Sequence, residues 1–130
     1  MLLVKTKLSS SPIHGLGVFA DEFIPCGKKI GQLVLSIDRK ITKFAFSTWP
    51  SSWKAMIKWY GYREGDYYYL NADDMRFFNH SDTPNTQQEG KADFAIRDIQ
   101  PGEELTCNYY SFDDDASFKL SDLQTRPSVV

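Results

Sequence analysis

Short stretches of alternating apolar and polar residues recur along this chain, separated by residues typical of turns. This period of two, with β-branched and aromatic residues in each stretch, predicts strands rather than helices. The predicted strands are 2–8, 18–20, 29–37, 67–70, 94–97 and 104–107. Within 29–37, the residues expected to be buried are Ile30, Leu33 and Leu35. Turn signals separate the strands, among them the loop 9–17 and the sequence Ile24-Pro25-Cys26-Gly27.

The segment 38–62 has a different pattern. Apolar residues recur there at i, i+3, i+4 and i+7, the stripe of an amphipathic helix. They are Trp53, Met56, Ile57 and Tyr60. Ser51 or Ser52 is expected to cap the start of this helix, and Gly61 follows its end. The chain is therefore predicted to be a single mainly β domain, 1–130, with minor α, a helical insert at about 38–62 and a weakly patterned tail at 113–130.

Composition and charge narrow the classes of function. The chain has 130 residues, enough for one hydrophobic core. Its net charge is −2 and it has no block of Lys and Arg, so nucleic acid is not expected as a direct partner. Cys26 and Cys107 are spaced for neither a zinc site nor a disulfide framework, which favours a reducing compartment. No apolar run reaches the roughly 18 residues of a membrane span, and Met1–Val4 is too short for a signal peptide, so a soluble, cytoplasmic protein is expected.

The segment 75–86, Met-Arg-Phe-Phe-Asn-His-Ser-Asp-Thr-Pro-Asn-Thr, is the most informative in the chain. Phe77 and Phe78 indicate that it enters a core, yet the seven positions 79–85 carry no large apolar side chain. Polar groups held near an apolar interior need partners, either within the protein or on a ligand. Two interpretations stay open at this point: an Asx-rich loop that satisfies itself, and a binding site.

Two further motifs lie on either side of this segment. The sequence Gly-Leu-Gly-Val-Phe-Ala occupies 15–20, and Gly-Glu-Glu-Leu-Thr-Cys-Asn-Tyr occupies 102–109 at a Pro-Gly turn. In this order and spacing, the three motifs resemble the SET-domain family of protein lysine methyltransferases over about 10–112. The compact chain is similar to the short, cysteine-poor bacterial or viral members. The resemblance implies a SET fold of several small sheets, with a C-terminal pseudoknot in which one segment threads beneath another loop.

The resemblance also implies a cofactor, S-adenosylmethionine, and residues that hold it. Backbone atoms of Gly15, Leu16 and Gly17 would contact the cofactor, although two such glycines also suit a plain turn before a strand. Asn79 and His80 resemble the family pair that holds the adenine and amino-acid ends of the cofactor, partly through main-chain atoms. No metal is expected.

Tyr109 is the residue that the resemblance assigns to catalysis, with its hydroxyl near the transferring methyl group and the target amine. A neutral phenol that positions the amine is favoured, because the ordinary pKa of tyrosine is about 10. Phe112 would either cover the adenine ring of the cofactor or pack in the core. At least one of Tyr67, Tyr68 and Tyr69 is expected to line the channel for the substrate lysine.

The partner that the resemblance implies is a protein or peptide bearing the target lysine. The acidic run 113–115 would attract a basic substrate, or it is a solvated surface. The chain departs from the family at Asp82, where many members have Cys, in the segment 30–34, which lacks a channel Tyr, and at Cys107, where some relatives have Phe or Tyr. It also lacks the cysteines for a zinc cluster after Tyr109, so the tail or the second subunit of a homodimer would complete the channel. A catalytically silent SET-fold module for binding or assembly is the alternative function.

Overall fold

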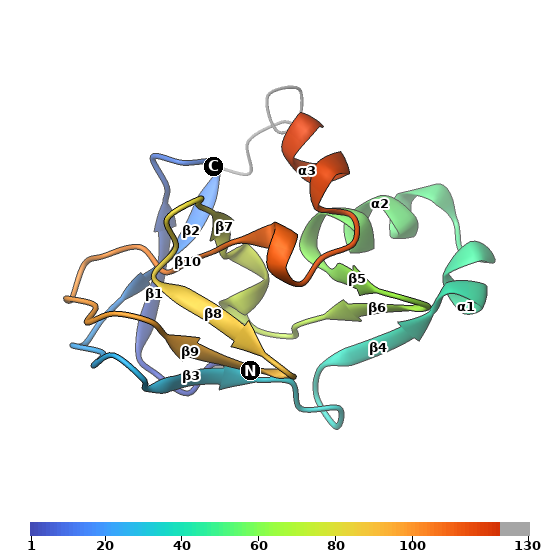
Figure 1. Cartoon of the computed structure of the whole chain (residues 1–130). Helices are drawn as coiled ribbons and strands as arrows, with labels where there is room; N and C mark the ends of the chain where they lie inside the picture. Colours follow the sequence, from blue (N-terminus) through green and yellow to red (C-terminus); the bar gives the residue numbers. More distant parts are fainter. Residues whose placement is uncertain (123–130) are drawn as a thin grey trace.

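The structure, a computed structural model, describes residues 1–122, which form two groups of small sheets (Figure 1). One group pairs β1 with β2 (Thr6–Ser10 and Leu16–Ala20) and contains a sheet of order β3-β9-β8 (Lys29–Gln32, Ala92–Ala95 and Thr86–Glu89). The other group, called here the helical lobe (residues 39–70), contains a sheet of order β4-β6-β5 (Arg39–Thr42, Tyr67–Leu70 and Tyr62–Glu64) and the helices α1 (Lys43–Ser47) and α2 (Ser51–Tyr60).

Shorter elements join the two groups. They are the single turns η1 (Asp74–Phe77) and η2 (Tyr109–Ser111), the strands β7 (Asn79–His80) and β10 (Thr106–Cys107), and the helix α3 (Ala116–Asp122). No helix within 1–122 is long and apolar enough to cross a membrane. The prediction of a mainly β domain of several small sheets with minor helix is confirmed.

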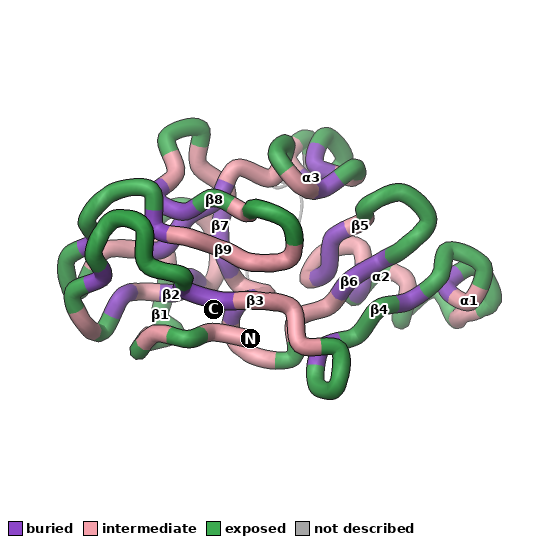
Figure 2. The backbone as a smooth tube through the Cα atoms, turned by 60° about the horizontal axis from the view of Figure 1, so that its bottom comes forward, coloured by how far each residue is buried: buried purple, intermediate pink, exposed green. Residues whose placement is uncertain are grey.

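The main core lies where the hairpin, the β3-β9-β8 sheet and the β7–β10 pair meet (Figure 2). Its fully buried side chains are Val18, Ile24, Ile30, Ile99 and Leu105. Ile24 and Ile99 form an antiparallel bridge, so two loops are fastened directly across this core. A smaller core in the helical lobe consists of Ile41, Phe46, Ile57 and Tyr68.

A parallel pairing of β7 with β10 places the motif at 79–86 beside the motif at 102–109. The side chain of Asn85 reinforces this pairing. Its amide donates to Glu104 O over 2.8 Å, and its Oδ1 accepts from Thr106 N over 2.9 Å. The Asn85 amide thus satisfies backbone groups of the C-terminal strand. This is the region in which the resemblance implied a pseudoknot.

The predicted strand 29–37 is shorter in the structure, because β3 ends at Gln32. The buried Asp38 carboxylate accepts from the N–H groups of Val34 and Ala72, both over 2.8 Å, and it lies 3.3 Å from the N-terminal amine. These contacts fold 33–38 into a turn. Leu35 is therefore 60% exposed, so the expectation that it is buried is wrong, whereas Ile30 is fully buried.

The other strand predictions differ mainly at their ends. The first strand was expected at 2–8 and lies at Thr6–Ser10, with Leu2 forming only a single bridge to Gly31. The strand Tyr67–Leu70 has the predicted bounds, while those expected at 94–97 and 104–107 lie at Ala92–Ala95 and Thr106–Cys107. Elements that the pattern did not predict are β5, β7, β8 and α3, and the strand β4, which lies where the helical insert was expected to begin; α1 lies within that insert.

The predicted amphipathic helix is confirmed as α2, with two differences. Pro50 rather than a serine occupies the N-cap position, and no side chain caps the helix; Gly61 closes the end by donating to Ile57 O over 2.8 Å. Of the predicted apolar stripe, Ile57 is buried, but Trp53 is 55% exposed and Met56 is 41% exposed. Half of the predicted stripe therefore faces outward rather than into a core.

Candidate active site

Asn79 connects the three motifs through its side chain. Its amide Nδ2 lies 3.1 Å from His14 O, 3.1 Å from Leu16 O and 2.9 Å from Glu104 Oε2. These contacts tie the glycine loop to the start of the C-terminal motif. The Asn79 amide is thus engaged within the protein, and a ligand at this position would meet backbone atoms.

The Glu104 carboxylate lies at the centre of these contacts, and the sequence analysis did not predict its role. It accepts from Ser11 Oγ at 2.8 and 3.0 Å as well as from Asn79. A Cβ atom at Gly17 would lie 2.4 Å from Glu104 Oε2, so Gly17 leaves room for this carboxylate. This close approach is a packing reason for the glycine at 17 that does not depend on a ligand. Gly15 has φ of +48°, which glycine adopts at no cost.

His80 holds the backbone of Tyr109. Its Nδ1 accepts a hydrogen bond from Tyr109 N over 3.1 Å, and its Nε2 lies 2.8 Å from Asp82 Oδ1. Because Nδ1 is the acceptor, the ring proton belongs on Nε2, which donates to Asp82. Asp82, the residue that differs from many family members, therefore fixes the tautomer and orientation of the ring.

Tyr109 is fixed at both ends. Its backbone is held by His80, and its hydroxyl donates to Phe78 O over 2.6 Å. The ring packs against the main core. A phenol that donates its hydrogen to a carbonyl keeps its oxygen lone pairs as acceptors. Towards any further group the Tyr109 hydroxyl can therefore act only as an acceptor.

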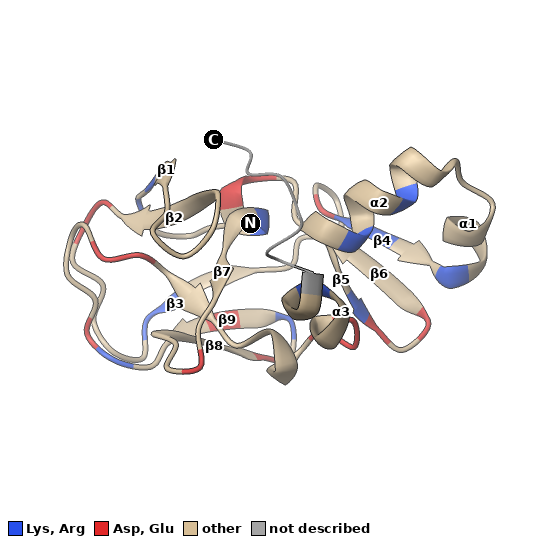
Figure 3. Ribbon diagram, turned by 90° about the horizontal axis from the view of Figure 1, so that it is seen from above, with Lys and Arg blue, Asp and Glu red and all other residues tan. Residues whose placement is uncertain are grey.

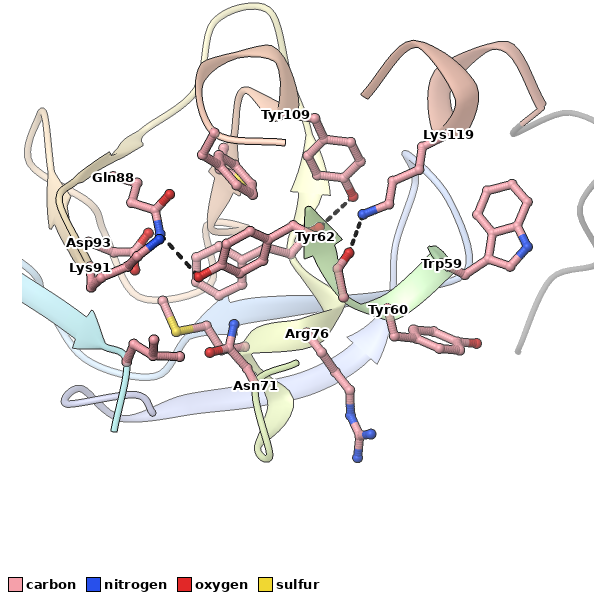
Figure 4. A pocket seen from close by; sticks show the side chains of 16 residues that line it. Trp59, Tyr60, Tyr62, Asn71, Arg76, Gln88, Lys91, Asp93, Tyr109 and Lys119 are labelled. Atoms are coloured by element: carbon pink, nitrogen blue, oxygen red, sulfur yellow. Dashed lines mark hydrogen bonds between the residues drawn. The ribbon is translucent and has the colours of Figure 1, made fainter. Parts of the chain in front are cut away.

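Two pockets meet at Tyr109. They share a wall formed by Trp59, Tyr60, Arg76, Phe78 and Tyr109. The glycine-loop pocket is completed by His14, Leu16, Phe77 and Asn79. The aromatic pocket, shown in Figure 4, is completed on its other sides by residues that include Tyr62, Asp93, Cys107, Phe112 and Lys119. Both predicted ends of the site, the glycine loop and Tyr109, are thus brought together with Asn79.

The aromatic pocket is narrow, with a volume of about 50 Å³. Phe112 packs edge-on against Tyr62 and Tyr109, with ring centroids 5.3 and 6.2 Å apart. Burial raises the pKa of the Tyr62 phenol and of the Cys107 thiol, so both are neutral near pH 7. Burial also raises the pKa of Asp93 to about 6. The walls of this pocket therefore suit an apolar side chain, and the Asp93 carboxyl group lies at one side.

The predicted channel residues at 67–69 lie elsewhere. Tyr68 packs in the small core of the helical lobe, and Tyr69 stacks on Tyr62 with centroids 5.2 Å apart. Tyr67, Tyr68 and Tyr69 do not line the aromatic pocket, and Tyr62 of β5 does so instead. The alternation of faces along β6 was predicted correctly, but which strand reaches the pocket depends on how β5 and β6 pair.

The acidic run 113–115 is mostly engaged within the protein. The Asp113 carboxylate is buried, lies 2.6 Å from Lys119 Nζ and accepts from Arg63 N over 3.1 Å. Asp115 pairs with Arg63 Nε at 3.1 Å, whereas Asp114 is more exposed. Lys119 Nζ also donates to Gly61 O and lies 5.3 Å from the Tyr109 ring centroid. The run fastens α3 to β5, so the expectation of a fully solvated surface is wrong for Asp113.

The described residues contain no group of His, Cys, Asp and Glu arranged to hold a metal ion. One buried polar atom lies in the shared wall without a hydrogen-bond partner among these residues, namely Arg76 Nε. A buried guanidinium N–H is costly to leave unpaired. An anionic group of a ligand would satisfy it.

Comparisons with known proteins bear on the family and the fold. The family model described as SET domain matches residues 15–110. A search of curated proteins by sequence found no significant match. Among solved structures, a candidate histone methyltransferase of Plasmodium falciparum aligns with a TM-score of 0.62 at 24% identity, over 83% of this chain and 95% of that chain.

Two structures of Polycomb Repressive Complex 2 from Chaetomium thermophilum, one apo and one bound to an inhibitor, give TM-scores of 0.68 and 0.65 at 21% identity. The alignments cover 89% and 88% of this chain but 16% of those chains. At these identities the likeness shows the fold. The family match spans most of the sequence, and the chain belongs to the SET-domain family.

Proposed function

We propose that this chain is a protein lysine methyltransferase that uses S-adenosylmethionine. The observation that carries the proposal is the meeting of two pockets at one tyrosine. The glycine-loop pocket and the aromatic pocket share the wall that contains Tyr109, and the Tyr109 hydroxyl is held by Phe78 O. A donor entering from one side and an acceptor entering from the other would meet beside this hydroxyl.

The residues of the glycine-loop pocket fit the proposed cofactor. Arg76 Nε lacks a partner among the described residues, and the carboxylate of the cofactor would supply one. Trp59, Tyr60 and Phe77 provide aromatic surface against which an adenine ring can pack. When bound, S-adenosylmethionine would supply a methyl group on a positively charged sulfur. The proposed binding set is Arg76, these aromatic residues and the backbone at Leu16 and Asn79.

Tyr109 would position the substrate amine. Its hydroxyl hydrogen is already donated to Phe78 O, so its lone pairs can accept an N–H of a neutral amine. This hydrogen bond would direct the nitrogen lone pair along one axis. Alignment of reacting groups can supply up to roughly 7–11 kcal/mol of a barrier, so positioning by a fixed Tyr109 would be the main contribution of the protein. The proposed role needs no titration of His80 or Tyr109.

The aromatic pocket supports lysine as the substrate side chain. Tyr62 and Phe112 offer apolar surface for a long aliphatic stem. The same cavity already holds an ammonium group, because Lys119 Nζ lies near the Tyr109 ring and donates to Gly61 O. Walls that accept this cation are suited to a second amine, provided that it arrives neutral at Tyr109.

The first test is calorimetric titration of the purified chain with S-adenosylmethionine. One saturable site is expected, and Arg76→Met is expected to weaken it because the variant loses the cationic partner of the carboxylate. Tyr109→Phe should bind the cofactor nearly as well as the wild type. The matched control is Tyr110→Phe, which removes the hydroxyl of a neighbouring tyrosine that is exposed.

The second test is methyl transfer to a library of lysine-containing peptides, followed by mass spectrometry. Wild type and Tyr110→Phe should transfer methyl groups, whereas Tyr109→Phe should lose about a hundredfold in rate. No cofactor binding by folded protein would contradict the proposal. Binding without transfer to any peptide would instead favour a catalytically silent module that keeps the fold.

A further inference from the structure

The outward-facing stripe of α2 forms one side of an apolar groove in the helical lobe. The groove has a volume of about 550 Å³ and lies between β4, α1 and α2. Its apolar lining includes Ala45, Trp49, Trp53, Met56 and Leu70. Trp49 and Trp53 meet edge-on with ring centroids 5.9 Å apart. An amphipathic helix normally buries its apolar stripe against another element, but this part of the α2 stripe is exposed to solvent.

The surroundings of the groove are cationic. The segment 39–62 contains five Lys and Arg residues and no Asp or Glu, in a chain whose net charge is −2. Figure 3 shows this as blue on α1, α2 and β4 with no red on the two helices. Two of the cations, Arg39 and Lys40, line the groove itself.

These five cations are not neutralised within the described part of the chain. The ion pairs there involve the N-terminal amine, Lys7, Arg63, His80, Lys91 and Lys119, and none involves a cation of 39–62. Lys40 instead lies 4.1 Å from the Tyr67 ring centroid, and Lys54 lies 5.9 Å from that of Phe46. The lobe therefore presents positive charge that a partner with carboxylates would match.

We propose that this groove binds an acidic, amphipathic segment of a partner protein. The apolar side chains of that segment would insert between Trp49, Trp53 and Met56. Its Asp and Glu side chains would pair with Arg39 and Lys40 at the groove and with Lys54 of α2. A short amphipathic helix laid in an apolar groove is a common mode of peptide recognition.

The apolar lining favours a protein segment over nucleic acid. Phosphate backbones are held by Lys and Arg spread along the contact. Here two cations and the polar residue Thr42 line the groove, and the rest of the lining is apolar. Exposed Trp and Met side chains that meet in a concave site are the usual anchors for a peptide. The cations around the groove would select an acidic peptide over a basic one, and the apolar lining would provide the contact area.

The helix α2 contributes residues both to the groove and to the candidate active site. α2 carries Trp53 and Met56 at the groove, and its last turn carries Trp59 and Tyr60 in the wall shared by the two pockets. The inference stands apart from the proposed function, because binding at the groove is measured without a cofactor.

The probes are two synthetic amphipathic peptides with identical Leu and Phe positions, one with Glu and one with Lys at the polar positions. Tryptophan emission reports binding directly, since two of the three Trp residues of the chain line the groove. The Glu peptide is expected to bind saturably and more weakly at high salt, and the Lys peptide is not. The double variant Arg39→Glu/Lys40→Glu and the variant Trp53→Ala should each weaken binding about tenfold or more.

The matched control is Lys28→Glu/Lys29→Glu, an adjacent exposed pair of cations outside the helical lobe, which should bind the Glu peptide like the wild type. Equal binding of the Glu and Lys peptides would overturn the proposal, as would equal weakening by both double variants. It would also be overturned if an oligonucleotide or an anionic lipid vesicle displaced the Glu peptide and bound more tightly. Concentration-dependent dimerisation that is lost in Trp53→Ala would assign the groove to a second copy of the chain instead.

Discussion

The backbone N–H of Tyr109 and the Nδ1 atom of His80 form a hydrogen bond of 3.1 Å. It joins two motifs that lie 29 residues apart in sequence. The hydroxyl of the same tyrosine donates to Phe78 O, only two residues before His80. Tyr109 is therefore held at its backbone and at its hydroxyl by one short segment. Any shift of that segment moves the proposed catalytic group with it.

The variant His80→Ala tests this relationship. Removing the acceptor leaves the N–H of Tyr109 unpaired, which should cost about 1–3 kcal/mol in the free energy of unfolding, measured by urea denaturation. His80→Asn places a side-chain oxygen near the position of Nδ1 and should recover most of that loss. Methyl transfer should follow the same order, with Asn above Ala. Equal stability of the two variants would show that the hydrogen bond to Tyr109 contributes little.

A second prediction concerns Gly17. In Gly17→Ala, the added Cβ would lie 2.4 Å from Glu104 Oε2, so the carboxylate must move away from Ser11 and Asn79. We expect a loss of about 1–3 kcal/mol in unfolding free energy, typical of an overpacked site. In a Glu104→Ala background the same substitution should cost much less, because the crowding atom is absent. Additive losses in this double-mutant cycle would contradict the steric explanation.

The residues of the candidate site were predictable because they sit in short motifs. Asn79, His80 and Tyr109 do converge, but what their side chains do depends on contacts across the fold. Asn79 binds two carbonyl groups of the glycine loop, and His80 binds the backbone at Tyr109. Glu104 was missed because a Glu after a Pro-Gly turn reads as an exposed residue. Its role arises from Ser11, 93 residues earlier in the chain.

The fold was predictable where one segment carries a complete pattern. β6 and α2 meet this condition, and both are present with close to the expected bounds. The segment 33–38 does not meet this condition. Its turn depends on Asp38, which binds Ala72 N and the N-terminal amine, and these distant partners cannot be predicted from the local sequence. The strands β4 and β5 each pair with β6, and their own sequences are short and largely polar. They become strands because they pair with β6 on either side, and this pairing cannot be read from the sequences of β4 and β5 themselves.

A third prediction uses the pH dependence of stability. The pKa of Asp93 is raised by burial to about 6, above its ordinary value of 3.8. The folded state therefore binds this proton more tightly than the unfolded state. Its contribution to stability is fully present below about pH 4 and is lost as the pH rises towards about 6. In Asp93→Asn this loss is absent, so the variant should gain stability relative to the wild type across that window.

Urea midpoints of wild type and Asp93→Asn, measured from acid to neutral pH, check this prediction. The difference between the two midpoints should grow through the window and become constant above it. A matched control is Asp98→Asn, since Asp98 is an exposed carboxylate beyond the end of β9, the strand that contains Asp93, and its contact is with the N–H of Cys26. Parallel profiles for wild type and Asp93→Asn would show that the Asp93 proton is not held in the folded state.

The last prediction concerns the buried ion pair of Lys119 with Asp113. Both side chains are almost inaccessible, at 7% and 0% exposure, and the Nζ and Oδ2 atoms are 2.6 Å apart. Lys119→Met should cost about 3–5 kcal/mol, because it leaves a buried carboxylate without its cation. Adding Asp113→Asn to that variant should restore much of the stability, since the amide keeps an acceptor for Arg63 N. Urea unfolding of the two single variants and the double variant measures the coupling. If the double variant is no more stable than Lys119→Met, then α3 is held to β5 by contacts other than this pair.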